Sequence, residues 1–155
     1  MEQISPRTDK SPQSNGVTPG VYLIGAGPGA ADLITVRGAR ILADADIVFY
    51  DALIDISMLE WCTGTRLVQV GKRCGSHSSS QHFINKQLVD AASKHLVVVR
   101  LKGGDPMIFG RAQEEIDALE KANVRYEIVP GITTALAASA ELRHCLLYTS
   151  DAADE

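Results

Sequence analysis

A short apolar run that leads directly into the glycine-rich segment GAGPG, at residues 25–29, constrains the fold of this chain most. The run, VYLI at residues 21–24, has the composition of a buried strand. Two more glycine-bearing segments follow apolar runs: VGKR at residues 70–73 and RLKGGDP at residues 100–106. Loops at strand ends are where open α/β sheets bind small ligands. The sequence therefore favours an enzyme built on such a sheet.

The length and composition are those of one folded domain. A chain of 155 residues allows one domain with its own core. A formal net charge of -4 argues against a general nucleic-acid or membrane-surface binder, because such proteins usually carry a basic excess. The longest aliphatic run, around residues 96–101, is far shorter than the ~20 residues that cross a bilayer. We therefore expect neither a nucleic-acid partner nor a membrane partner.

The cysteines and histidines indicate a reduced, metal-free protein. Cys62, Cys74 and Cys145 are odd in number and form no CxxC pair, which fits neither a disulfide framework nor a thiolate zinc site. Free thiols are typical of a cytoplasmic protein. The four histidines lack the spacing and the glutamate partner of a helical zinc site, so no metal ligands are assigned.

Short β-branched runs alternate with stretches of helical periodicity, which is the pattern of successive βαβ units. The runs are nearly all apolar on both faces, as buried parallel strands should be. We predict an α/β fold with a five-stranded, mostly parallel sheet and helices on both faces, and the sequence leaves the strand order open. The expected strands are residues 21–24, 47–50, 66–70, 96–101 and 126–129.

Helical periodicity lies between these runs. In the second expected helix, Phe83 and Ile84 are predicted to face the sheet. In the third, Glu115 is predicted to face solvent, and Asn123 is a candidate C-terminal cap. The expected helices are residues 35–43, 80–93, 111–123 and 133–142, with a short one at 56–62.

GAGPGA satisfies the loose form of a dinucleotide-binding fingerprint. Gly25, Gly27 and Ala30 have the required spacing, and Asp51 follows about twenty residues on, after the second strand. Pro28 argues against this interpretation, because it has no N–H for a pyrophosphate and its ring fixes φ where the loop amides should converge. A tight structural turn is the alternative.

KGGDP is a more specific signal. Gly103 and Gly104 permit a backbone path that is closed to other residues and leave amides and carbonyls open to a ligand. Pro106 favours an extended Asp105, which would fix the direction of the Asp105 carboxylate. A simple hairpin-like connection remains the alternative.

Charged and hydroxyl side chains follow three of the expected strands. Asp51 ends the second strand, and Lys72 ends the third, so acid and base candidates share the carboxyl edge of the sheet. Taken singly, Asp51 can be a helix cap and Lys72 a solvated charge. After the fifth strand, Thr133 or Thr134 can cap a helix or bind a ligand.

With GAGPG, the Asp51 strand end, VGKR, RLKGGDP-IFGR and VPGIT in this order, residues 21–142 resemble the tetrapyrrole methylase family. This resemblance implies transfer of methyl groups from S-adenosylmethionine to two pyrrole carbons of uroporphyrinogen III, giving precorrin-2 for sirohaem or cobalamin synthesis. Such chemistry needs positioning and proton management. The alternatives are another tetrapyrrole or precorrin methylase, or the dinucleotide-binding module of a dehydrogenase.

The resemblance also implies roles for individual residues, motif by motif. Asp51 is the expected proton acceptor and Lys72 the expected proton donor. Because the substrate carries many carboxylates, Arg73, Lys102 and Arg111 are expected to bind it. The expected contacts of the cofactor S-adenosylmethionine are Pro28, Gly103, Gly104, Asp105, Ile108, Thr133 and Thr134.

The resemblance divides the chain into three parts. Residues 1–19 are expected to be a disordered tail, residues 20–143 the family's N-terminal domain, and residues 144–155 a non-family tail of artefactual origin. The family's second α/β domain is expected to be missing. Since the family's active site lies between its two domains, the chain alone is predicted to be inactive or nearly so. A homodimer is expected for the full-length protein.

Overall fold

The computed structural model describes residues 17–52, 54–70 and 81–146. Its five strands form one sheet in the order β3-β2-β4-β1-β5, and every pairing among them is parallel. The predicted α/β fold with a five-stranded sheet is confirmed. The strands are β1 (Gly20–Gly25), β2 (Ile47–Asp51), β3 (Arg66–Val70), β4 (Val97–Lys102) and β5 (Tyr126–Val129).

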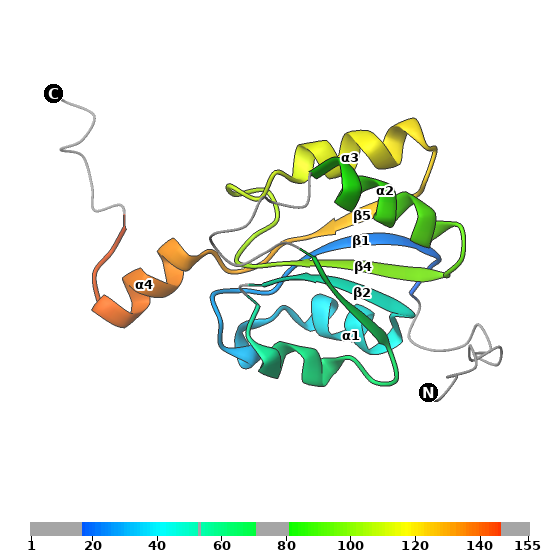
Figure 1. Cartoon of the computed structure of the whole chain (residues 1–155). Coiled ribbons are helices and arrows are strands. Elements are labelled where there is room, and N and C mark those ends of the chain that lie inside the picture. The colour runs from blue at the N-terminus through cyan, green and yellow to red at the C-terminus, as the bar shows by residue number, and fades with distance from the viewer. Residues whose placement is uncertain (1–16, 53, 71–80, 147–155) are drawn as a thin grey trace, which may run out of the picture.

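Helices cover both faces of the sheet, as predicted (Figure 1). The helices are α1 (Val36–Asp44), α2 (Gln81–Ala92), α3 (Ala112–Lys121) and α4 (Thr134–Leu142), with 3-10 helices η1 (Ala31–Leu33) and η2 (Ile56–Trp61). In β1, Val21 and Leu23 belong to the core beneath α2 and α3, whereas Tyr22 and Ile24 belong to the core beneath α1 and η2. Among the described helices, none has the length and apolarity that crossing a membrane requires.

On two predicted helix faces one residue each is placed wrongly, while the other inward residues are confirmed. Phe83 is 53% exposed, because the inward stripe of α2 consists of Ile84, Leu88 and Ala91, which stand four and three residues apart. Glu115 was expected to face solvent and is fully buried. Its carboxylate pairs with Arg100 and Lys102 of β4. Both cations are buried and therefore need a counter-charge.

Helix α3 ends at Lys121 with Ala122 as its cap, and Asn123, the predicted cap, stands one residue further on. Asn123 adopts a left-handed conformation with φ 53°, in which asparagine is tolerated better than most residues. The N–H of Asn123 donates to the carbonyl of Glu120 and that of Val124 to the carbonyl of Leu119, both at 2.9 Å. These bonds satisfy carbonyls that the end of the helix leaves free.

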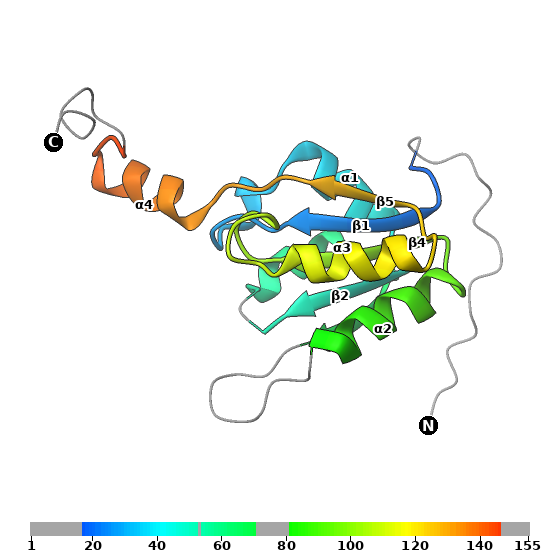
Figure 2. The same cartoon turned by 90° about the horizontal axis from the view of Figure 1, so that it is seen from above.

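Helix α4 projects away from the sheet (Figures 1 and 2). Its first turn is capped by Thr133, whose Oγ1 accepts a 3.3 Å hydrogen bond from the N–H of Leu136. None of its residues is buried, although its sequence, TALAASAEL, is largely apolar. The described part of the chain therefore leaves this helix without a packed face.

Candidate active site

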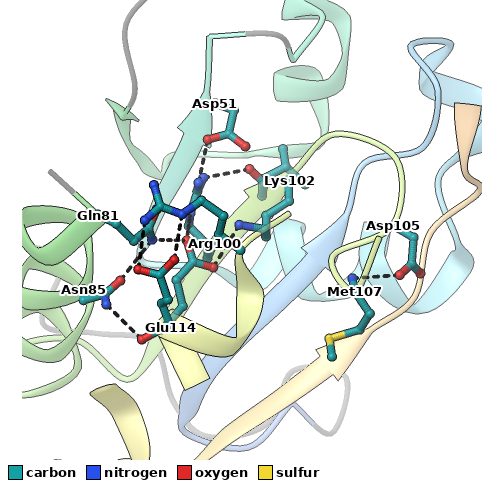
Figure 3. Close-up of polar contacts among 11 residues, drawn as sticks. Asp51, Gln81, Asn85, Arg100, Lys102, Asp105, Met107 and Glu114 are labelled. Atoms are coloured by element: carbon teal, nitrogen blue, oxygen red, sulfur yellow. Dashed lines mark hydrogen bonds and ion pairs between the residues drawn. The ribbon is translucent and has the colours of Figure 1, made fainter. Parts of the chain in front are cut away.

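Three loops meet at the carboxyl edge of the sheet. The loops after β1 and β4 exchange two backbone hydrogen bonds: Gly27 N to Gly104 O at 3.1 Å and Gly104 N to Gly27 O at 2.8 Å. Asp105 then joins the loop after β4 to the loop after β5, because its Oδ2 accepts from Gly131 N at 3.0 Å. Its Oδ1 accepts from Met107 N at 2.8 Å (Figure 3). The Asp105 carboxylate is fixed by these two amides, whereas an orienting effect of Pro106 stays a prediction.

Close backbone approach explains the glycines of these loops. A Cβ added to Gly25 would lie 2.6 Å from both the carbonyl oxygen of Gly104 and the Cα of Gly131. Gly27 and Gly104 also have positive φ angles, 80° and 64°, which side chains rarely adopt. The GAGPG and KGGDP motifs are therefore required for the three loops to pack together.

A cavity of about 320 Å³ lies at this edge, within the size range of small-molecule sites. Seven of the residues predicted for the site line it: Pro28, Asp51, Lys102, Gly103, Gly104, Ile108 and Thr134. They come from the ends of β1, β2, β4 and β5, which are far apart in sequence. The structure thus brings these seven residues together at one edge of the sheet, and their roles stay predictions.

The other five predicted residues are placed differently. Lys72 and Arg73 lie outside the described residues. Asp105 holds two loops together, and Thr133 caps α4. Arg111, at the start of α3, has an exposed side chain whose Nε donates to the Glu114 carboxylate at 2.7 Å.

A network of charges adjoins the cavity and shares Asp51 and Lys102 with it; Figure 3 shows its polar contacts. Arg100 is only 2% exposed, and its Nη2 lies 2.5 Å from Asp51 Oδ1. Its Nε donates to Glu115 Oε1 at 2.9 Å, while Lys102 Nζ donates to Glu115 Oε2 at 3.0 Å. Burial lowers the pKa of Lys102, as does the positive charge of Arg100, and the charge of Glu115 partly offsets both.

Arg100 and Glu115 were missed as site residues. The signal for Arg100 was present in the sequence, because VVVRLK places an arginine inside an apolar strand that was expected to be buried on both faces. Such a cation requires a buried counter-charge. Glu115 had no comparable signal, since a glutamate beside another on a helix is usually solvated.

The segment after β2 supplies further lining residues that sequence reasoning missed, namely Ile54, Asp55 and Met58. Asp55 caps η2 by accepting hydrogen bonds from Ser57 Oγ and Ser57 N, and these bonds lower the pKa of Asp55. Phe109, fully exposed with φ 53°, also lines the cavity. Its signal was the run of three apolar residues in the loop DPMIFG.

The site lacks the arrangement that binds a dinucleotide. In that fold β1 and β2 are neighbours, whereas here β4 lies between them. The helix after the glycine loop begins only at Val36, with Thr35 as its cap, so its N-terminus is not joined directly to the loop. Of the described residues, no group of three or more His, Cys, Asp or Glu side chains could hold a metal ion.

The fold and motifs are those of a known family. A model of the tetrapyrrole (corrin/porphyrin) methylases matches residues 20–151, and the chain belongs to this family. The uroporphyrinogen-III C-methyltransferase of Cyanidium caldarium is 46% identical over 83% of this chain and 51% of its own length. That of Methanocaldococcus jannaschii is 51% identical over 76% of this chain and 49% of its own length. The chain thus spans about half the length of these relatives.

A solved structure extends the comparison to a bound ligand. The uroporphyrin-III C-methyltransferase of Thermus thermophilus, complexed with S-adenyl homocysteine, superimposes with a TM-score of 0.68 at 42% identity. The match covers 77% of this chain and 48% of the Thermus chain. The likeness therefore concerns the half of that enzyme that corresponds to the described fold.

Proposed function

We propose that this chain provides one half of a uroporphyrinogen-III C-methyltransferase, which methylates uroporphyrinogen III to precorrin-2 for sirohaem or cobalamin synthesis. The observation that carries the proposal is that the loops with the motifs GAGPG, KGGDP and PGIT pack together beside one cavity. Two relatives that are 46% and 51% identical to this chain bear this name.

The residues that line the cavity suit S-adenosylmethionine. Two carboxylates, Asp51 and Asp55, line it, and the one lysine among the described lining residues is engaged with Glu115. This balance favours a cationic sulfonium over an anionic pyrophosphate. Glycine backbone groups and apolar side chains complete the lining. We assign the cofactor to Pro28, Gly103, Gly104, Ile108 and Thr134, with Asp105 and Thr133 shaping its loops.

When bound, S-adenosylmethionine supplies an electrophilic methyl group. Asp51, at the cavity wall, is assigned the one proton that the pyrrole system loses for each methyl group that it gains, and the role of Lys72 as a proton donor is proposed from the motif alone. The Asp51 carboxylate is suited to this role because only one of its oxygens is paired with Arg100 in the described contacts.

Substrate carboxylates require cations, and the structure separates the candidates. Lys102 is buried and paired with Glu115, so we assign it to the support of the site. Arg111 has a side chain that is 58% exposed and can turn from Glu114 toward a substrate carboxylate. Arg73 is proposed as a second substrate contact from the motif alone.

We also propose that turnover requires the part of the relatives that the match does not cover. Two observations support this: the chain spans about half of their length, and α4 exposes Leu136 and Leu142 without burying any residue. The 155 residues alone are therefore expected to bind the cofactor weakly.

Calorimetric titration separates the main alternatives. The chain is expected to bind S-adenosylhomocysteine and not NAD, and the reverse result would contradict the proposal in favour of a dinucleotide-binding module. Methyl transfer is then measured with the chain fused to the C-terminal half of the Methanocaldococcus relative. Methylation of uroporphyrinogen III is expected, and Asp51→Asn should abolish it while Asp117→Asn, an exposed site on α3, should not. Methylation of a precorrin alone would indicate another tetrapyrrole methylase.

A further inference from the structure

One buried carboxylate holds two cations at the back of the site. Glu115 has no exposed surface, and each of its oxygens accepts from a different cation: Oε1 from Arg100 at 2.9 Å and Oε2 from Lys102 at 3.0 Å. The guanidinium is further fixed by a 3.1 Å bond from Nη1 to the carbonyl of Leu101. Both cations lie on β4, so their backbone positions are set by the centre of the sheet.

The two cations reach the cavity in different ways. Lys102 lines it directly, whereas Arg100 reaches it through Asp51, whose carboxylate lies 2.5 Å from the guanidinium. Among the described lining residues, the charged side chains are Asp51, Asp55 and Lys102. Two of these three are therefore connected to Glu115.

Glu115 is itself held from a second helix. Gln81, at the start of α2, donates from Nε2 to Glu115 Oε1 at 3.2 Å. Asn85, one turn later, donates from Nδ2 to the carbonyl of Glu114 at 2.8 Å (Figure 3). These contacts hold the side chain of Glu115 and the backbone of α3 beside it. The Glu115 carboxylate is therefore held in one orientation.

We propose that Glu115 is a positioning residue for methyl transfer, which directs the Asp51 carboxylate through Arg100 and holds Lys102 directly. The role rests on the proposed function, in which Asp51 accepts a proton. Without the Glu115 charge, Arg100 and Lys102 have only Asp51 as an anionic partner in the described network. Both cations then compete for that carboxylate and turn it away from the reacting carbon. A misplacement on the order of 1 Å is enough to cost ~100-fold in rate.

The variant that tests this role is Glu115→Gln, which keeps the size of the side chain and removes its charge. Glu115→Asp restores the charge on a shorter arm and is expected to recover part of the effect. The matched control is Asp117→Asn, on the same helix, where the lost carboxylate is exposed and bonded only to Gln113 in the described contacts.

Two readouts are combined. In the fused protein, Glu115→Gln is expected to lower kcat by about 10-fold to 100-fold while the dissociation constant of S-adenosylhomocysteine changes by less than about 2-fold. In nitrogen-15 spectra of the 155-residue chain, the variant is expected to lose the protected Arg100 Nε–H signal and to lower the pKa of Lys102 further. Asp117→Asn should leave kcat and both signals unchanged.

The outcomes distinguish this inference from the proposed function. Folded Glu115→Gln protein with unchanged kcat would overturn the inference. The inference would also be overturned if Glu115→Gln lowered the rate as much in an Arg100→Met protein as in the protein with Arg100. If Glu115 acts through Arg100, the two effects on the rate are not additive. If the fused protein without any substitution methylates nothing, the proposed function fails. The spectra of the 155-residue chain still decide the positioning: Glu115→Gln signals of Arg100 and Lys102 that match those of Asp117→Asn would overturn it.

Discussion

At the scale of single residues, the site depends on three buried charges, Arg100, Lys102 and Glu115, and on the partly exposed carboxylate of Asp51. Arg100 and Lys102 on β4 face Glu115 and Asp51, so two cations meet two carboxylates. Taking charges out of water is costly, and their attraction offsets that cost only while the set is complete. Removal of one member therefore affects stability as well as chemistry.

Arg100→Met is expected to reduce the free energy of unfolding by about 3–5 kcal/mol, because it leaves Asp51 without its cation and the buried Glu115 with Lys102 alone. Arg37→Met is the control: Arg37 pairs with Glu127 at 3.4 Å, with side chains 67% and 38% exposed. That change should cost about 1 kcal/mol or less. Urea unfolding followed by circular dichroism measures both. Equal losses would show that the Arg100 network is not buried as described.

Cys62 gives a prediction on pH. Burial raises the pKa of its thiol from 9.0 to about 11, so between these values the folded state holds a proton that the unfolded state releases. The contribution of Cys62 to stability is thus complete below pH 9.0 and is lost as the pH rises toward about 11. The difference in unfolding free energy between wild type and Cys62→Ala should therefore shift against wild type above pH 9.0. A difference that is independent of pH would contradict it.

At the scale of elements, three loops form one unit, because β1, β4 and β5 are neighbours in the sheet. The bonds between Gly27 and Gly104, and from Gly131 to Asp105, connect them. Cavity shape is therefore a property of all three loops together. A change in the packing of one loop should therefore shift the lining residues of the other two loops.

Gly25→Ala is expected to destabilise the protein by about 1–3 kcal/mol, since its methyl group would meet rigid backbone of two other loops. Gly103→Ala is the matched control, because a Cβ there has no neighbour within 4 Å and the φ angle of Gly103 is not positive. It should cost no more than about 0.5–1 kcal/mol. Thermal unfolding of both variants checks this. A Gly25→Ala protein as stable as wild type would mean that the loops separate easily.

At the scale of the whole molecule, a layered body and a projecting helix are energetically distinct. The body has one core on each face of its sheet, whereas α4 has no buried residue. Leu142 is 76% exposed, while Leu119 in α3 is fully buried. The apolar residues of α4 therefore contribute little to holding the described fold together.

Leu142→Ala is accordingly expected to change the free energy of unfolding by less than about 0.5 kcal/mol. Leu119→Ala removes the same atoms from the core and should cost about 2–5 kcal/mol. Chemical denaturation of the two variants in parallel is the measurement. A large loss for Leu142→Ala would indicate that α4 packs on the body in solution.

The fold class was predictable from the sequence because its signals are local. Apolar runs such as VVVRLK and glycine turns after them mark buried strands wherever they pair. The position of β4 between β1 and β2 was not predictable, since strand order depends on pairing between segments that are far apart in the sequence. Asn123 was recognised because an asparagine after a periodic segment is a local signal as well.

The candidate site was predictable only in its outline. The rule that parallel strands end at one edge brought Pro28, Asp51 and Gly104 to the cavity. Glu115 was missed because its partners, Arg100 and Lys102, stand on another element, and a helical pattern alone cannot show a contact between elements. The chemical roles assigned to Asp51, Lys72 and the cofactor contacts stay predictions.

The bond from Gly131 to Asp105, together with the pair formed by Gly27 and Gly104, has a consequence for biosynthesis. Gly27 follows the first strand of the sheet, and Gly131 follows the last. While the ribosome is still making β5, the lining residues that follow β1, β2 and β4 are present, but Thr134 is not. We therefore expect the cavity of a nascent chain to be complete only after that last strand has emerged and paired with β1.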